Sequence, residues 1–398
     1  MFTIIMQITE GISEFFSQEE LSNEHALAIR QRYSKNVKIT QDFADKDKRF
    51  EVLSQNYIGH LPVSKDFTLS ILPKVRIANI FKMLECALKV ESVKILKGRV
   101  DVETLDDLSE ALASKLALLV LERVRKGLYS SYEQQTGLLP FVRGRINVGS
   151  TLRSQQWPPT TLCCEYEEHT PDVEDNRILL WTLYRLRQLS FKKEEYHKSI
   201  RRAYQALNGS VSLELKEANE CIGRSYNRLN DDYEPMHMLC SFFLQHLSPG
   251  IMTGARAFLP FTLYMPALFQ SFVLELLREY FSNHIIVKYE EEEVKATVTL
   301  TLKMDVVLRD ALTNNVIAVI DAKYKRDQFP SNQDIFQIVT YAHYMNSPKA
   351  ILVYPSSSSE YYKAPIRDIN VQTVVCDISQ DDLGQKRFCH DLAQALET

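Results

Sequence analysis

The sequence lacks the cysteine spacing of a zinc or iron–sulfur site. Its seven cysteines are scattered, and none forms a Cys-x-x-Cys pair or stands with a histidine at zinc-site spacing. Two histidines of one predicted helix, His237 and His246, are too far apart for a ligand pair, so we interpret them as packing residues. An odd, dispersed set of cysteines is typical of reduced thiols and predicts a cytoplasmic protein.

The sequence also lacks a membrane segment, a nucleotide loop and an excess of basic charge. No apolar run reaches membrane-spanning length, and the first ten residues lack the basic start of a signal peptide. No Gly-x4-Gly-Lys-Ser/Thr motif occurs, so we expect no nucleotide to bind this chain itself. With 47 Lys and Arg against 51 Asp and Glu, an enzyme acting on DNA would need local positive charge or a DNA-binding partner.

At 398 residues the chain is longer than one typical domain, and no linker rich in glycine or serine divides it. Trp157-Pro158-Pro159 marks a boundary. We predict an α+β or α/β protein with a strand-rich N-terminal domain over 1–157, a helical middle region over 158–255 and a C-terminal domain over 256–398. The last domain should be a mixed sheet flanked by helices.

Hydrophobic periodicity in the C-terminal domain predicts the order helix, three strands, helix, strand. The expected helices cover 265–281 and 332–345, and the expected strands lie at 285–289, within 297–320 as a hairpin, and at 350–354. The acidic run 290–293 is interpreted as a solvated turn before the hairpin.

Three charged residues stand at the strand ends of the predicted hairpin. Asp321 and Lys323 share one face of a strand, and the hairpin would bring Asp305 beside them. Buried carboxylates repel each other unless a cation neutralises them, and Mg²⁺ is commonly held by one or two carboxylates. We predict that Asp305 and Asp321 bind Mg²⁺ and that Lys323 positions water or stabilises phosphate charge. A salt bridge at the sheet rim is the alternative.

Two other pairs are candidate site residues. Gln337 and Tyr341 are one helical turn apart, so they face together either toward the acidic strand ends or toward solvent. Arg143 and Arg145 project together from an extended segment, where they contact a phosphate or partner, or else form a solvated, salt-bridged turn.

In this order and spacing, the motifs resemble the McrC family, the nuclease subunits of McrBC modification-dependent restriction systems. The matching pieces are Ile71-Leu72-Pro73-Lys74, Arg143-Gly144-Arg145-Ile146, Asp175-Asn176-Arg177, Arg228-Leu229-Asn230 with Tyr233, residues 261–269, Asp305, Asp321-Ala322-Lys323-Tyr324-Lys325, and Asp334-Ile335-Phe336-Gln337 with Tyr341.

The resemblance implies a PD-(D/E)XK nuclease core in the C-terminal domain. Asp305 would be its first acid, with Met304 in place of the usual proline, and Asp321-Ala322-Lys323 would be the second half of the motif. Gln270 stands where the family pattern has a glutamate, so the number of metal ions stays open. Gln270, Gln337 and Tyr341 would surround the catalytic residues.

The resemblance also implies partners. The N-terminal domain would dock onto a hexamer of a McrB-like AAA+ GTPase and stimulate its hydrolysis, while the C-terminal domain cuts double-stranded DNA carrying methylated cytosine. Two nuclease subunits could also dimerise. The alternatives are a nuclease-inactive adaptor that activates the GTPase, favoured by Gln270, and a stand-alone RecB-like nuclease, in which Gln337-x3-Tyr341 also occurs.

Overall fold

The computed structural model describes residues 4–41, 49–64, 66–88, 104–154, 160–246, 262–281, 284–294, 300–325, 330–355, 362–378 and 382–397. The fold is mixed α+β and contains several sheets, which confirms the predicted class at this level. The chain forms two compact units: Met1–Leu108 with Pro260–Thr398, and Ser109–Leu259. The first unit therefore joins both ends of the chain. The three consecutive domains predicted from the sequence stay a prediction.

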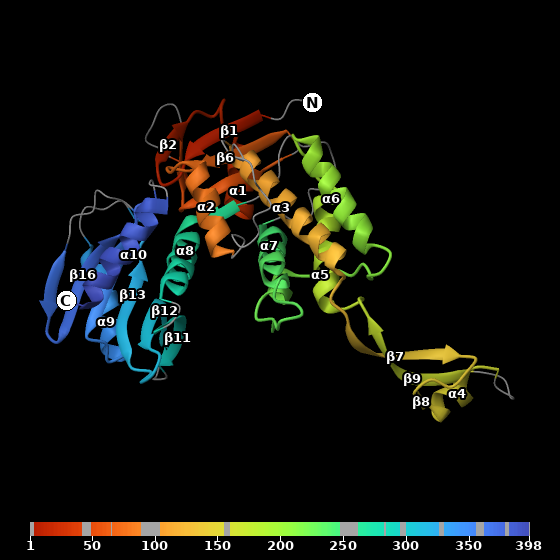
Figure 1. Cartoon of the computed structure of the whole chain (residues 1–398). Coiled ribbons are helices and arrows are strands. Elements are labelled where there is room, and N and C mark those ends of the chain that lie inside the picture. The colour runs from red at the N-terminus through yellow and green to blue at the C-terminus, as the bar shows by residue number, and fades with distance from the viewer. Residues whose placement is uncertain are drawn as a thin grey trace. The chain divides into compact units, whose positions relative to one another are not determined.

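The N-terminal part of the first unit contains two sheets (Figure 1). One has the strand order β1 (Ile4–Thr9), β6 (Phe67–Leu72), β5 (Tyr57–Pro62) and β10 (Thr262–Tyr264); the other is β2 (Ser13–Phe16), β4 (Phe50–Ser54) and β3 (Val37–Gln41). Helix α1 (Asn23–Arg32) begins where the Ser22 hydroxyl accepts the His25 N–H. Its Ala26 and Ile29 join the apolar core that both sheets share. Helix α2 (Ile77–Ala87) follows β6 and buries its apolar face.

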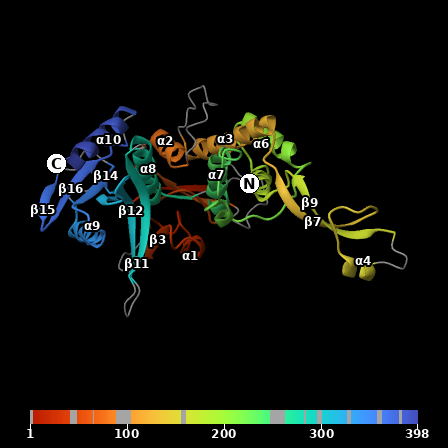
Figure 2. The same cartoon turned by 60° about the horizontal axis from the view of Figure 1, so that its bottom comes forward.

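The C-terminal part of the first unit is a six-stranded mixed sheet. Its strand order is β11 (Ile285–Val294), β12 (Leu300–Asp310), β13 (Val316–Ala322), β14 (Lys349–Tyr354), β16 (Ile369–Val375) and β15 (Lys363–Ile366). β14 is parallel to both neighbours and apolar along almost its whole length, as a strand covered on both faces requires. Helices α9 (Asn332–Tyr344) and α10 (Asp382–Glu397) lie on opposite sides of β14 and β16 (Figure 2). Helix α8 (Met265–Tyr280) packs against β11, β12, β13 and α2.

The acidic run 290–293 is part of strand β11, so its interpretation as a turn was wrong. Glu290 to Glu293 pair with Met304 to Thr301 of β12. The strand tolerates the charge because it forms the edge of the sheet and cations lie opposite: Arg309 holds Glu290 with two bonds of 2.8 Å, and Lys303 lies 3.1 Å from Glu291.

The second unit contains helices and one small sheet. The helices are α3 (Leu105–Lys126), α4 (Val148–Ser154), α5 (Glu174–Leu186), α6 (Glu194–Leu207) and α7 (Tyr233–His246), with a 3-10 turn η1 (Ala218–Cys221). The sheet has the order β7 (Ser131–Leu139), β9 (Leu162–Thr170) and β8 (Arg145–Ile146). Strand β9 begins inside the region that was expected to be helical. Burial alternates along β7 and along the second half of β9, as in a sheet with one face more exposed than the other.

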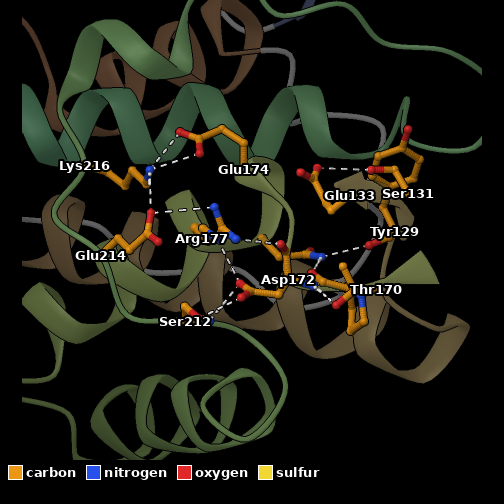
Figure 3. A network of polar contacts seen from close by, with 12 residues as sticks. Tyr129, Ser131, Glu133, Thr170, Asp172, Glu174, Arg177, Ser212, Glu214 and Lys216 are labelled. Carbon is orange, nitrogen blue, oxygen red and sulfur yellow. Dashed lines mark hydrogen bonds and ion pairs between the residues drawn. The ribbon is translucent and has the colours of Figure 1, made fainter. Parts of the chain in front are cut away.

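A polar network anchors the segment before η1 to the start of α5 (Figure 3). Asp172 accepts hydrogen bonds from Arg177 and Ser212, and these bonds outweigh burial and lower the pKa of Asp172 to about 2. Lys216 lies 3.0 Å from Glu174 and 3.2 Å from Glu214. The acidic first turn of α5 therefore faces cations, which satisfies both the carboxylates and the buried ammonium.

The described residues contain no helix whose length and apolarity would suit a membrane crossing. All seven cysteines are free thiols and are buried. His237 is fully buried and hydrogen-bonded, as expected for a packing residue; the His246 side chain lies outside the described residues.

Candidate functional site

The structure places Asp305 and Asp321 side by side on two paired strands, with Asp305 in the middle of β12 and Asp321 near the end of β13, so the expected strand-end position holds for Asp321 alone. β12 and β13 are antiparallel with Val306 opposite Ile320, so the next facing positions are Asp305 and Asp321. The backbone N–H of Ala322 donates to Asp305 Oδ2 at 2.8 Å. Asp305 is 8% exposed and Asp321 2% exposed. The hairpin thus encloses two carboxyl groups in an apolar sheet.

Burial disfavours the ionised form of both carboxyl groups. Burial and the neighbouring Asp321 raise the pKa of Asp305 to about 7. Burial also raises the pKa of Asp321, although Lys323 opposes that shift. Asp321 Oδ2 is inaccessible to solvent and accepts no aligned hydrogen bond, and its contact is an ion pair with Lys323 Nζ at 2.7 Å.

Lys323 follows directly after β13 and links the carboxyl pair to α9. Its backbone N–H donates to Val353 O at 2.8 Å, which continues the pairing with β14 past the last strand residue. Its ammonium donates to Gln337 Oε1 at 2.8 Å, and Gln337 Nε2 donates to Tyr341 OH at 2.8 Å. The face of α9 that carries Gln337 and Tyr341 therefore points toward Lys323 and the carboxyl pair and not into solvent.

The start of α9 is fixed by a capping box, which sets the position of Gln337. Ser331 accepts the Asp334 N–H at 3.2 Å, and the Asp334 carboxylate accepts the Ser331 N–H in return. Lys325 Nζ binds both Asp334 oxygens, at 2.9 and 3.0 Å. The link from Lys325 to Asp334 was missed by the sequence reasoning, although the Ser-x-x-Asp signature of a cap was visible.

Gln270 reaches the site from α8. Its side chain hydrogen-bonds the Asp305 carboxyl and lowers the pKa of that group against the effect of burial. An amide adds no negative charge, and the described residues contain no cluster of three His, Cys, Asp or Glu side chains with metal-site geometry. The site is thus built around two carboxylates.

This donor set fits a single hard divalent cation. Mg²⁺ takes oxygen ligands and is often held by one or two carboxylates, with water and substrate phosphate completing its coordination. Asp305 and Asp321 provide such oxygens, and a cation between them would remove the repulsion and the unmet burial cost of Asp321 Oδ2.

Arg143 and Arg145 lie in the second compact unit, whereas Asp305, Asp321 and Lys323 lie in the first. Arg143 stacks over the Tyr166 ring at 4.1 Å and lies 3.4 Å from Glu168. Arg145 is exposed on β8. Gly144 between them has φ +65, and a Cβ there would stand 2.3 Å from Glu165 O. Only glycine fits this turn.

A family model for the McrBC 5-methylcytosine restriction system component matches residues 52–355. The chain belongs to this family. The resemblance predicted from its sequence motifs is therefore confirmed.

One relative of this McrBC-family chain is the type IV methyl-directed restriction enzyme EcoKMcrBC of Escherichia coli (strain K12). The two are 23% identical over 358 residues, which covers 80% of this chain and 95% of the relative.

Two solved structures resemble the chain. One is a chain of the half-complex from the tetradecameric assembly of Thermococcus gammatolerans McrB AAA+ hexamers with bound McrC. It has a TM-score of 0.53 and 16% identity, and the match covers 98% of this chain and 100% of that one. A second, the cryo-EM structure of the Thermococcus gammatolerans McrBC complex, has a TM-score of 0.44 and 18% identity over 69% of this chain and 87% of that chain. The first likeness shows a common fold.

Proposed function

We propose that this protein is the metal-dependent endonuclease subunit of a McrBC-type, modification-dependent restriction system. It would hydrolyse phosphodiester bonds of double-stranded DNA carrying methylated cytosine. The observation that carries the proposal is the meeting of Asp305 from the middle of β12 with Asp321 and Lys323 at the end of β13. We interpret their order and the flanking helices as a PD-(D/E)XK core, in which Lys323 would take the lysine position.

Asp305 and Asp321 are the residues that would hold Mg²⁺. When bound there, Mg²⁺ supplies Lewis-acid polarisation of the scissile phosphate and makes a coordinated water more acidic. Gln270 lowers the pKa of the Asp305 carboxyl through its side-chain amide and would help to orient that group. The Ala322 N–H does the same from the strand itself.

Lys323 is the cation that this chain offers to the reacting phosphate. Its ammonium is held between Asp321 and Gln337, with Tyr341 fixing the Gln337 amide. Held in this way, it can orient the attacking water and stabilise negative charge that grows on the phosphate oxygens. Because the ammonium is already in position, the reaction does not bear the entropy cost of orienting it.

The proposed partner is a McrB-like AAA+ GTPase hexamer, whose hydrolysis this chain stimulates in the cytoplasm. A solved chain of similar fold comes from an assembly of such hexamers with bound McrC. Arg145 is exposed, and Phe141, Val142 and Val148, which are close to it in the sequence, are each about 60% exposed. We place a partner contact on this basic and apolar surface, with the stacked Arg143 at its border. Dimers of the nuclease subunit would form within the assembly.

The first prediction tests the nuclease centre with plasmid DNA, Mg²⁺, GTP and the partner GTPase. Asp321→Asn and Lys323→Met should each lower the cleavage rate by about 100-fold or more, because each removes a group that acts on the reacting phosphate. Stimulation of the partner's GTP hydrolysis should stay at the wild-type level. Lys363→Met, at an exposed position of β15, and Asp368→Asn, in the exposed turn between β15 and β16, are the matched controls. Undiminished cutting by either site variant would defeat the assignment.

The same assay separates two other functions. An adaptor with an inactive nuclease fold, which Gln270 favours, would stimulate the GTPase while the wild-type chain cuts no DNA. A stand-alone RecB-like nuclease would cut without partner or GTP.

A further inference from the structure

The segment that carries Lys323 is also held from the N-terminal sheet. Tyr324, the next residue, directs its hydroxyl to Glu10 Oε2 at 3.4 Å. The Lys74 ammonium lies over the Tyr324 ring, 4.6 Å from its centre, and the Phe269 ring of α8 lies 6.0 Å from the same ring. Tyr324 is 5% exposed. The residue after the proposed catalytic lysine is therefore buried against parts of the chain that are distant in the sequence.

Glu10 and Lys74 also contact each other and the ends of strands β1 and β6. Glu10 directly follows β1, its backbone N–H donates to Leu72 O at 2.9 Å, and its side chain is fully buried. Lys74 lies just past the end of the paired strand β6. Its backbone N–H points at Glu10 Oε2 at 3.5 Å, and its ammonium lies 3.8 Å from Glu10 Oε1. A buried carboxylate is stable only with such partners, so the burial of Glu10 depends on Lys74 and Tyr324.

Side-chain direction gives this anchor its effect on Lys323. Strand β13 ends at Ala322, and successive residues of an extended chain point to opposite sides. Lys323 and Lys325 contact Gln337 and Asp334 of α9, whereas Tyr324 contacts Glu10 and Lys74. Residues 323–325 thus have contacts with α9 on one side and with the N-terminal sheet on the other, directly after the end of β13.

The other element of the site is attached to the same N-terminal sheet. β10 pairs with β5, and the backbone N–H of Met265 at the start of α8 donates to Asn56 O at 3.0 Å. Gln270 stands about one and a half turns further along α8. The helix that orients Asp305 and the segment that carries Lys323 therefore share one support.

We propose that Glu10 and Lys74 are positioning residues for DNA cleavage, because through Tyr324 they set the place of the Lys323 ammonium relative to the two carboxylates. This inference rests on the proposed nuclease function. It makes the N-terminal sheet part of the cleavage apparatus. A shift of about 1 Å in a catalytic group can cost about 100-fold in rate, so the loss of such a support should appear in turnover.

The experiment measures steady-state DNA cleavage by the full chain with its partner, Mg²⁺ and GTP. Glu10→Leu and Lys74→Met should each lower kcat by about tenfold with KM for DNA unchanged. Tyr324→Phe, which keeps the ring and loses the hydroxyl, should lower kcat by about threefold. Lys74→Arg should restore most of the rate, because a guanidinium also stacks on the ring. Lys38→Met, at an exposed position of β3, is the control and should cut at the wild-type rate.

Two readouts separate positioning from general damage. Stimulation of the partner GTPase should be unchanged in every variant. Glu10→Leu with Tyr324→Phe should be no slower than Glu10→Leu alone, because the hydroxyl contact that Tyr324→Phe removes is already absent in Glu10→Leu. Equal loss of cleavage and GTPase stimulation, or wild-type kcat in Glu10→Leu and Lys74→Met, would overturn the inference. If cleavage by the variants is normal while Asp321→Asn is inactive, the proposed function survives alone. A wild-type chain that cuts no DNA would overturn both.

Discussion

Buried titratable residues occur in two conditions in this protein. Asp305 and Asp321 are unfavourable as buried anions, because burial raises the pKa of both and the neighbouring Asp321 raises that of Asp305 further. His237 is fully satisfied: it is hydrogen-bonded to Tyr226 OH at 2.9 Å through Nδ1 and to Asp175 O at 3.0 Å through Nε2. A carbonyl can only accept, so Nε2 carries the proton and Nδ1 accepts from the tyrosine. This neutral form is the one that the fold stabilises.

The stability of the second unit should fall in mild acid because of His237. Burial lowers the pKa of His237 to about 4, the Asp175 carbonyl and carboxylate oppose that shift, and Arg224 adds to it. The unfolded histidine titrates near pH 6.5, so between about 6.5 and 4 the unfolded chain binds the extra proton. The contribution is complete above that window and is lost by about 1.4 kcal/mol per pH unit on going down through it.

Denaturant unfolding at pH 7 and pH 5 checks this prediction. His237→Gln should be less stable than wild type at pH 7 but should lose much less between the two pH values. His343→Gln, at an exposed position of α9, should keep the wild-type pH dependence. An identical slope in wild type and His237→Gln would contradict the assignment.

The sequence predicts the site residues that lie close to one another along the chain, but not those that come from distant parts of it. Asp321 and Lys323 follow from the two-residue period of a strand, and Asp305 from the antiparallel pairing of a hairpin. Glu10 could not be foreseen, because it lies 314 residues from Tyr324 and no local pattern marks that contact. The functional roles of all these residues stay predictions.

Single elements show where periodicity was enough and where it was not. Helices α8 and α9 and strand β14 were predicted to within a few residues, because each has a continuous apolar pattern. β11 was cut short because four successive glutamates are unfavourable in most strands. Pairing with β12 and the cations Lys303 and Arg309 override that local preference, and neither partner is adjacent in the sequence.

Gly144 should be required for the turn between β7 and β8. Gly144→Ala would force φ +65 on an alanine and press its Cβ to 2.3 Å from Glu165 O, so we expect a loss of about 1–3 kcal/mol in unfolding free energy. The displaced Arg145 should also weaken stimulation of the partner GTPase. Gly209→Ala is the matched control, because a Cβ there meets nothing within 4 Å. Thermal unfolding and a GTPase titration measure both effects, and a fully stable, fully stimulating Gly144→Ala would refute the prediction.

At the scale of the whole molecule, the first compact unit is assembled from the two ends of the chain. β10 adds a strand from residues 262–264 to the N-terminal sheet, and α8 packs against α2 as well as against the C-terminal sheet. Sequence composition could not reveal these contacts between the two ends of the chain, because composition indicates domains only as continuous stretches of sequence. Folding of the candidate site should then depend on long-range contacts formed late, after residues 262–397 have been made.

The last prediction follows from that arrangement. Residues 256–398 expressed alone should expose the α8 surface that α2 covers and lose the partners of β10 and Tyr324, so this fragment should aggregate or unfold at low denaturant. Co-expressed with residues 1–108, it should become soluble and copurify as one complex. Tyr264→Lys, at the strand that joins the two fragments, should weaken their association, while Lys363→Met should not. A fragment 256–398 that folds and cuts DNA by itself would instead establish an independent nuclease domain with the boundaries expected from the sequence, and would leave the N-terminal sheet no part in the chemistry.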